Sequence, residues 1–237
     1  MMRVVSYGGG VDSTAMIIRM LERKEKIDLI VFADTGAEWP ETYNYIWMFR
    51  GWLLQHHGLV MSLVQADVGP MYPYLFARKT FPDRMFPRHI EKWKIRPVEL
   101  FVQACRAGQQ VEMCLGIDYD EADRVRTPRR KWITNRYPLV DWMIGRRGAE
   151  NIIKNAGLPI PMKSGCWFCP FTDNKRWLKL KHGHPELFTL ARQMEENATL
   201  YPKVTIHHSG TLSKIDLRVD GNETIEQSCE SVGMCGR

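Results

Sequence analysis

The sequence predicts an α/β protein, in which a parallel twisted sheet is flanked by helices and a small, mainly helical, cysteine-containing module follows at the C-terminal end. Short apolar runs, typical of buried parallel strands, alternate with helical patterns along the first part of the chain. The turns between them are short and marked by glycine, as expected where crossover helices connect parallel strands. The pattern of residues along the chain changes after Pro159 and Pro161. We therefore expect an α/β domain over residues 1–160 and a C-terminal module over residues 161–237 that packs against it.

The composition is that of an ordinary globular chain. It has 237 residues, of which 44% are hydrophobic and 25% charged, enough for one full domain with a small appended module. No apolar stretch approaches the length of about 18 residues that a membrane-spanning helix needs, and the first residues are too glycine-rich for a secretory signal. We therefore expect a cytoplasmic protein with no membrane partner. The net charge of +6 permits a polyanionic partner without requiring one.

The apolar patterns predict the following elements in chain order. We expect strands at residues 3–6, 28–33, 60–64 and 111–117. We expect helices at residues 13–23, 40–58, 97–106 and 141–156, and one or two more over about 173–197. Asp141 would cap the helix that begins there. Residues 67–96 are rich in proline, aromatic and basic residues and lack a clear period, so we expect a long active-site loop or lid with little regular structure.

A glycine triplet at residues 8–10 lies between the first expected strand and the first expected helix. At such a position backbone N–H groups and the helix dipole form an anion site, and glycines let the main chain approach a phosphate. Ser13 and Thr14 would add hydroxyl donors, and Asp12 would hold a magnesium ion or orient a phosphate-bound water. The alternative is a tight turn capped by Asp12 or Ser13. The spacing matches neither GxxxxGK[ST] nor GxGxxG, which argues against a P-loop NTPase and a dinucleotide-binding enzyme.

The six cysteines are unlikely to form disulfides in a reducing compartment, so we consider metal ligands and core residues instead. Two pairs flank the C-terminal module, a CxxC turn and a CxxxxxC pair. Four thiolates suit either zinc or a [4Fe–4S] cluster, and the spacing leaves both open. The four candidate ligands are Cys166, Cys169, Cys229 and Cys235. Cys105 and Cys114 are expected to be buried core residues, with Cys114 as the reserve ligand.

A basic stretch begins at Arg124. It places five positive charges in the eight residues up to Lys131, with Trp132 beside them and further arginines up to Arg147. Charge interleaved with an aromatic residue is typical of a surface that binds a nucleic-acid backbone or a splayed base. We therefore expect contact with DNA or tRNA through residues Arg124–Arg147. A solvated basic face, or arginines turned inward to a nucleotide's phosphates, are the alternatives.

Four segments resemble motifs of one superfamily. Ser6–Thr14 (SYGGGVDST) is similar to the SGGxDS pyrophosphate loop of the N-type ATP pyrophosphatases, with Gly8 in place of the serine. Phe32–Thr42 (FADTGAEWPET) resembles the F-x-DTG…PET signature of the phosphoadenylylsulfate (PAPS) reductase branch. Lys94–Pro97 (KIRP) resembles the basic K-x-x-P segment that closes over the phosphates in this branch, and Leu115–Arg124 resembles its LGI…DE..R motif. For Asp118–Asp123 a strand end followed by a solvated helix start is an equal alternative.

The resemblance implies a Rossmann-like, adenine nucleotide alpha hydrolase-like fold that binds ATP with Mg²⁺. It places the pyrophosphate at the glycine loop and the adenosine across the strand ends near Asp34, for which a helix cap is the plainer alternative. The residues it implies for nucleotide binding are Ser6, Gly8, Gly9, Gly10, Asp12, Ser13, Thr14, Asp34, Thr35, Gly36, Lys94 and Arg96. Among them it implies catalytic roles for Asp12, Ser13 and Lys94, the lysine by neutralising the departing pyrophosphate.

The cysteine segments extend this resemblance. Ser164–Phe171 (SGCWFCPF) and Cys229–Cys235 (CESVGMC) are similar to segments of PAPS-reductase-like proteins that bind a [4Fe–4S] cluster. Those proteins include the ATP pyrophosphatase component of bacterial DNA phosphorothioation systems. True PAPS reductases carry a C-terminal Glu-Cys-Gly-x-His segment, whereas this chain ends Met234–Arg237 (MCGR). We therefore rank sulfonate reduction below ATP-dependent adenylation.

The expected function is that of an ATP pyrophosphatase, which adenylates a substrate oxygen and releases pyrophosphate. The adenylated oxygen would then be replaced by sulfur in a nucleic acid, as in DNA phosphorothioation or tRNA thiolation. A sulfur-donor protein such as a cysteine desulfurase is the partner that this reaction implies. One alternative is a PAPS or adenylylsulfate reductase, and another is a non-catalytic nucleotide- or nucleic-acid-binding module with structural zinc. The oligomeric state stays open, a homodimer included.

Overall fold

The computed structural model describes residues 1–82, 88–199, 205–206 and 210–212. The chain divides into two compact units, which we describe one after the other. The first unit comprises Met1–Asp34, Glu38–Gln65 and Ile95–Ser164, and the second comprises Thr35–Ala37, Ala66–Lys94 and Gly165–Arg237. The predicted division at residue 160 stays a prediction.

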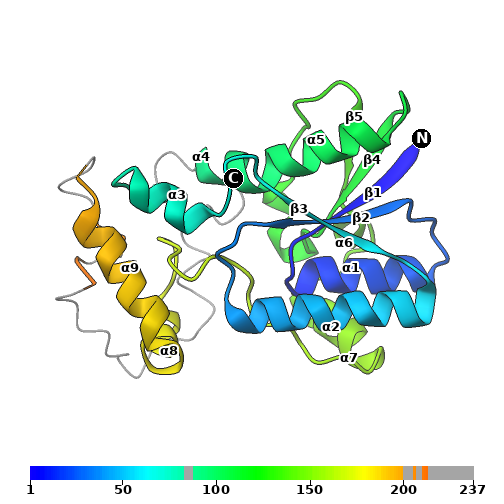
Figure 1. Cartoon of the computed structure of the whole chain (residues 1–237). Coiled ribbons are helices and arrows are strands. Elements are labelled where there is room, and N and C mark those ends of the chain that lie inside the picture. The colour runs from blue at the N-terminus through cyan, green and yellow to red at the C-terminus, as the bar shows by residue number, and fades with distance from the viewer. Residues whose placement is uncertain (83–87, 200–204, 207–209, 213–237) are drawn as a thin grey trace. The chain divides into compact units, whose positions relative to one another are not determined.

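The first unit is built on a parallel sheet with the strand order β3-β2-β1-β4-β5 (Figure 1). The strands are β1 (Met2–Tyr7), β2 (Leu29–Asp34), β3 (Met61–Gln65), β4 (Val111–Leu115) and β5 (Ile133–Arg136). The chain moves outward from β1 to β3 and then returns to the other side of β1, so the strand order reverses between β1 and β4. At such a switch point the connections after the two central strands diverge and leave a ligand-binding crevice. The glycine loop follows β1 directly and therefore lies at this point.

Helices cover both faces of the sheet. Figure 1 shows α1 (Val11–Glu22), α2 (Pro40–His57) and α7 (Arg146–Asn155) below the strands, with α5 (Arg96–Cys105) above them. The core divides in the same way. Side chains from α1, α2 and α7 form one apolar cluster with the sheet, and side chains from α5 form another. The predicted α/β class, a Rossmann-like parallel sheet flanked by helices, is confirmed.

Most of the predicted elements of this unit are present. The strand expected at residues 60–64 is β3, and the helix expected at 40–58 is α2. Gly58 ends α2 in the left-handed conformation with φ 64°, which glycine adopts without the steric cost of a Cβ atom.

The prediction of an irregular lid at residues 67–96 is wrong. This segment contains α3 (Met71–Ala77), α4 (Arg88–Ile90) and a π-helical turn, Glu91–Ile95, that continues into α5. Pro70 immediately precedes α3, where proline is tolerated because the first helical N–H groups have no intrahelical acceptor. The proline-rich composition therefore marks a helix start here and does not exclude regular structure.

The helix expected over residues 141–156 is two helices. A short α6 (Pro138–Asp141) is followed by a turn in which Met143 has φ 52°, and α7 begins only after Gly145. Asp141 therefore does not cap the longer helix. Strand β5, inside the basic stretch, was not predicted, because Ile133 is its only apolar residue and an edge strand needs little burial.

The second unit contains α8 (Asn174–Gly183) and α9 (Pro185–Asn197), which pack against each other through Trp177 and Phe188. This pair confirms the helices expected over residues 173–197. The buried carboxylate of Glu195 accepts hydrogen bonds from the backbone N–H groups of Ile206 and Leu212, at 2.9 and 2.7 Å. It thereby fixes two later points of the chain to α9. In the described part of the chain, no helix is both long and apolar enough to cross a membrane.

Candidate active site

The glycine loop is held in shape by the two hydroxyl groups that follow it. Ser13 Oγ accepts a hydrogen bond from the Gly8 N–H at 3.2 Å and donates to the Gly10 carbonyl at 3.3 Å. Thr14 Oγ1 donates to the same carbonyl at 2.8 Å and also contacts the Tyr7 hydroxyl at 3.2 Å. Thr14 is completely buried and Ser13 nearly so. These hydroxyls therefore stabilise the conformation of the loop.

Two glycines allow this loop to form. Gly9 has φ 75°, and a Cβ atom there would lie 3.2–3.3 Å from side-chain atoms of Ile46 and Thr42 on α2. Gly116, which follows β4, lies so close to the start of α1 that a Cβ atom would be 2.6 Å from both Cα and N of Ser13. The loop after β4 therefore packs directly on the first turn of α1, at the switch point of the sheet.

The backbone amides of the loop form a donor-rich surface. Gly10 is the N-cap of α1, and no side chain caps this helix. Within the described residues, the N–H groups from Gly9 to Ser13 have no hydrogen-bond acceptor. A helix start with unsatisfied N–H groups, reinforced by the helix dipole, binds anions such as phosphate. Asp12 does not cap the helix, whereas Ser13 does close the turn through its hydrogen bonds to Gly8 and Gly10, so phosphate binding by this loop stays a prediction.

An acidic pair lies beside this donor surface. Burial, together with the negative charge of Asp118, raises the pKa of Asp12 to about 6, while Arg146 opposes the shift. Asp118 is also buried, which raises its pKa, although its Oδ1 accepts a hydrogen bond from the Glu121 N–H at 3.1 Å. Two carboxylates that burial disfavours as anions form a place where a cation would be stabilised.

The donor set at Asp12 fits a magnesium ion. Asp12 Oδ1 is buried without a hydrogen-bond partner, and the nearest cationic group, Arg146 Nη1, is 3.6 Å away. The described residues contain no group of three or more acidic, histidine or cysteine side chains placed to hold a metal. Mg²⁺ does not require one, because it is usually bound by one or two carboxylates together with water and substrate phosphates.

Arg146 is positioned by its neighbours on α7 and on the loop after β4. Its backbone N–H donates to Asp120 Oδ2 at 2.8 Å, and its Nε donates to Glu150 at 3.1 Å. Gly145 is required before it, because a Cβ atom there would collide with the Asp120 carboxylate. The sequence analysis placed Arg146 in a nucleic-acid surface, whereas the structure places its guanidinium near Asp12.

Asp34 ends β2 and is held by two side chains that the sequence analysis missed. The Tyr43 hydroxyl donates to Asp34 Oδ1 at 2.6 Å, and Gln65 Nε2 donates to Oδ2 at 2.9 Å. Burial and the carboxylate together raise the pKa of Tyr43. Because α2 is capped by Trp39 without a side-chain hydrogen bond, Asp34 is not the helix cap considered as an alternative. Gln65 pairs with Asp34 in the register of β2 and β3, a signal visible only once the register is known.

The remaining residues of the predicted nucleotide site fall in both units. Ser6 lies within β1 and Arg96 begins α5, both in the first unit. Thr35, Gly36 and Lys94 belong to the second. The buried Thr35 accepts a hydrogen bond from the Ala37 N–H at 3.2 Å, and Gly36 has φ 67° and packs closely on Pro70. Lys94 lies in the π-helical turn, a deformation often found at functional sites.

Half of the predicted cysteine site is described. Cys166 and Cys169 lie in one turn, closed by a hydrogen bond of 3.1 Å from the Cys169 N–H to the Cys166 carbonyl. Neither forms a disulfide among the described residues. Cys229 and Cys235 lie outside the described residues. The described pair places two cysteine side chains in one turn, which fits half of a [4Fe–4S] or zinc site; the site itself stays a prediction.

The other two cysteines behave differently from each other. Cys114 is fully buried in β4, as predicted. Cys105 is exposed at the end of α5, so the prediction that it is a core residue is wrong.

Comparison with known proteins supports the fold. The sequence matches no known family profile and no curated protein. The structure is similar to the phosphate complex of PAPS reductase from Candida auris, with a TM-score of 0.50, 13% identity, and coverage of 70% of this chain and 81% of that one. It also matches the U34-tRNA thiolase NcsA from Methanococcus maripaludis with its [4Fe–4S] cluster, with a TM-score of 0.40, 15% identity, and coverage of 86% and 72%. At this level of identity the likeness to the reductase supports the Rossmann-like α/β fold.

Proposed function

We propose that the chain binds ATP at the glycine loop, transfers AMP to an oxygen of its substrate and releases pyrophosphate. The observation that carries this proposal is the run of unsatisfied N–H groups from Gly9 to Ser13 beside the buried pair Asp12 and Asp118. Amide donors bind the phosphate oxygens, while the carboxylates bind a cation that accompanies them. A magnesium nucleotide combines both charges in one ligand.

We assign the residues the following roles. The loop amides would hold the β- and γ-phosphates, and Asp12 would hold a Mg²⁺ ion, which would supply positive charge to the leaving pyrophosphate. The attacking oxygen forms a bond to the α-phosphorus while the bond from that phosphorus to the bridging oxygen of the β-phosphate breaks. Lys94 and Arg96 add positive charge for the departing pyrophosphate. Ser13 acts by holding the loop in its amide-presenting shape.

The adenylated substrate is a nucleic acid, DNA or tRNA, in which attack by sulfide-level sulfur forms the new bond to sulfur while the activated oxygen leaves as part of AMP. A donor protein of the cysteine desulfurase type supplies the sulfur as a persulfide, and a thiol reductant supplies the two electrons that release it. Cys166 and Cys169 would hold one side of a [4Fe–4S] cluster, with Cys229 and Cys235 as the other two ligands, and such a cluster would carry sulfur or set a redox state. The link to DNA phosphorothioation is part of this proposal.

The reaction is tested with ATP labelled at the α-phosphate, incubated with Mg²⁺ and candidate nucleic acids. We expect labelled AMP or an AMP adduct together with pyrophosphate. Asp12→Asn should reduce turnover at least 100-fold, whereas Glu22→Gln, an exposed carboxylate at the other end of α1, should leave it unchanged. Formation of ADP and phosphate, or no turnover with any acceptor, would contradict the proposal. Release of sulfite from PAPS with thioredoxin would instead establish the reductase.

The cysteine site is tested by anaerobic purification. A brown protein with about four irons per chain indicates the [4Fe–4S] cluster, and Cys166→Ser should abolish that iron. Cys105→Ser is the matched control, because Cys105 is exposed in the other unit. A colourless, zinc-loaded protein would show that the cysteines hold structural zinc and not a cluster.

A further inference from the structure

The basic stretch from Arg124 to Lys131 lies in the loop that precedes the edge strand β5. It contains no acidic residue, and none follows before Asp141. Such a stretch attracts polyanions in general, so its charge alone does not identify a partner. The ion pairs of the structure show which of its cations are available to one.

Three of the arginines are neutralised within the first unit. Arg124 pairs with Glu121, Arg130 Nε lies 2.7 Å from a Glu99 carboxylate oxygen, and Arg136 pairs with Glu25. These side chains have structural partners that a ligand would have to displace.

Two other cations have no such partner. Arg126 and Lys131 are both exposed, and within the described residues neither side chain makes an ion pair or hydrogen bond. The loop therefore holds two cations that a phosphate group can contact without breaking an existing interaction.

A hollow of about 490 Å³ lies in the same loop. It is lined by Val125, Arg126, Thr127, Pro128, Ile133, Thr134, Asn135 and Tyr137. This volume is within the range of about 300–1,000 Å³ that small-molecule sites occupy, so it can accept a nucleobase. Two of the lining side chains, Ile133 and Tyr137, are buried, and Arg126 is exposed.

Hydrogen bonds give the hollow a fixed shape. The Tyr137 hydroxyl accepts from the Arg126 N–H and donates to the Arg126 carbonyl, both at 2.8 Å. Asn135 Nδ2 donates to that carbonyl at 2.9 Å, which fixes the orientation of the amide because a carbonyl can only accept. Asn135 Oδ1 is thereby left as an acceptor, suited to the exocyclic amino group of a base.

Trp132 is not a base-stacking platform in this arrangement. The guanidinium of Arg106 lies 4.8 Å from its ring centroid, and the ring packs against the core beneath α5. The hollow, and not the tryptophan, is therefore the place for a base.

We propose that a single-stranded segment of nucleic acid binds along this loop, with phosphates on Arg126 and Lys131 and one base in the hollow lined by Asn135. The choice of a nucleic acid rests on the proposed function, while the location rests on the ion pairs and the hollow. A single strand is favoured over a duplex because only an unpaired base can leave its stack and enter a hollow beside the backbone.

The test measures binding of fluorescently labelled single-stranded DNA and RNA of about 20 nucleotides by anisotropy over a salt series. The double variant Arg126→Gln/Lys131→Gln removes the available cations. Its matched control, Arg124→Gln/Arg130→Gln, removes the same charge from the same loop but takes cations that already have partners. Thermal melting of both variants checks that they fold.

We expect the first variant to lose at least tenfold in affinity and its salt slope to fall by about 1.4, since each phosphate contact on a single strand contributes about 0.7. The control should change affinity less than threefold. Thr127→Trp, which fills the hollow without changing charge, should weaken binding of the normal strand but not of an abasic one. Equal losses in both double variants, or tighter binding of duplex than of single strands, would overturn the proposal.

This outcome is separable from that of the proposed function. If the strand binds through Arg126 and Lys131 but ATP is not cleaved at the α-phosphate, the location stands and the adenylation proposal fails. If ATP is cleaved but neither oligonucleotide binds, or an acidic peptide binds in preference, the inference about this surface is wrong and the reaction is unaffected.

Discussion

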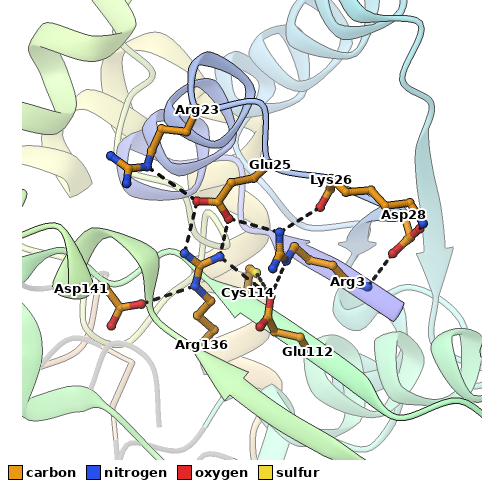
Figure 2. Close-up of polar contacts among 9 residues, drawn as sticks. All are labelled: Arg3, Arg23, Glu25, Lys26, Asp28, Glu112, Cys114, Arg136 and Asp141. Atoms are coloured by element: carbon orange, nitrogen blue, oxygen red, sulfur yellow. Dashed lines mark hydrogen bonds and ion pairs between the residues drawn. The ribbon is translucent and has the colours of Figure 1, made fainter. Parts of the chain in front are cut away.

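Two charged regions of the first unit are built in opposite ways. Around Glu25, in the loop between α1 and β2, lie Arg136, Arg3 and Arg23, and the two arginines Arg136 and Arg3 also contact Glu112 (Figure 2). Every charge there has a partner of opposite sign. At the carboxyl ends of the strands, Asp12 Oδ1 lies 3.6 Å from Arg146 Nη1 but lacks a hydrogen bond, and the loop amides have no acceptor among the described residues.

The pKa shifts have opposite signs in the two regions. Hydrogen bonding to Arg136 lowers the pKa of Glu25, whereas burial raises the pKa of Asp12 to about 6. The first carboxylate is thus stabilised as an anion by the fold, and the second is destabilised as one. We call the region around Glu25 the saturated network, because its charges all have partners and contribute to stability. We call the region around Asp12 and the glycine loop the unsaturated region, because its groups without hydrogen bonds remain able to bind a ligand. This difference distinguishes charges that stabilise the fold from those that we propose bind a ligand.

The largest expected effect comes from breaking the saturated network. Glu25→Gln keeps the size of the side chain but removes one of the two carboxylates that Arg136 and Arg3 share, the other being Glu112. We expect a loss of about 3 kcal/mol in the free energy of unfolding, the lower end for a buried pair, since both partly buried arginines lose one anionic partner. Chemical denaturation at pH 7 measures it. Because the pKa of Glu25 is lowered in the folded state, its contribution should vanish as the pH falls below that pKa.

The control for this variant is a solvent-exposed pair on α1. Arg19 and Glu22 form an ion pair at 2.7 Å in which both side chains are about two-fifths exposed. Glu22→Gln should therefore cost less than about 0.5 kcal/mol. Equal losses for Glu22→Gln and Glu25→Gln would show that the network is not special.

Gly116→Ala tests the unsaturated region by disturbing the backbone packing between the loop after β4 and the start of α1. The new methyl group would lie 2.6 Å from Ser13 Cα and N, so the first turn of α1 must move. We expect a loss of about 2 to 3 kcal/mol in stability, as for overpacked cores, together with loss of ATP binding measured by equilibrium dialysis.

The matched control is Gly51→Ala within α2, where a Cβ atom would have no neighbour within 4 Å. Alanine is the better helix former, so this variant should gain about 0.5 to 1 kcal/mol. If Gly116→Ala binds ATP normally, the close approach at the switch point does not shape the site.

The fold was predictable because strands β1 to β4 each carry a short apolar run, and their alternation with helices along the chain leaves few topologies. The edge strand β5 was not predictable in the same way, since only Ile133 in it is apolar. The helix α3 was not predicted, because segments rich in proline and aromatic residues often lack regular structure. Here Pro70 immediately precedes the helix, and Tyr72 stacks on Phe76 within it.

The glycine loop was predictable for a local reason, because loop and helix start are adjacent in sequence. Its partners were not, since they come from distant segments. Gly116 lies over a hundred positions from Ser13, and Gln65 meets Asp34 only through the register of β3 on β2. Ion pairing is also invisible in sequence, so Arg130 and Lys131 look alike there although only Arg130 pairs with Glu99.

Asp12→Asn tests the unsaturated region through pH. The folded-state pKa of Asp12 is raised to about 6, so ionisation of this residue destabilises the fold as the pH rises from 4 to 6. The neutral asparagine avoids that penalty. In a buffer free of metal and nucleotide, we expect the variant to be about 2 kcal/mol more stable than the wild type at pH 8 and equal to it near pH 4.

Thermal and urea unfolding at the two pH values measure this difference. Asp28→Asn is the opposite control, because the pKa of Asp28 is lowered in the folded state and its charge contributes to stability at neutral pH. A loss of stability in Asp12→Asn at pH 8 would mean that Asp12 holds the fold together and is not poised for a cation.

The smallest expected effect concerns Asp34. Its carboxylate has hydrogen-bond partners, as in the saturated network, but it also ends β2 at the edge of the sheet where we propose that the nucleotide binds. Tyr43→Phe removes the donor at 2.6 Å and should cost about 1 kcal/mol, the usual net value of one hydrogen bond. If Asp34 also contacts the adenosine, this variant should weaken ATP binding by a further threefold to tenfold while leaving binding of free pyrophosphate unchanged. Equal weakening for both ligands would mean that Tyr43 only maintains the shape of α2. Asp34 would then belong to the structural charges, and Asp12 alone of the two would bind the nucleotide.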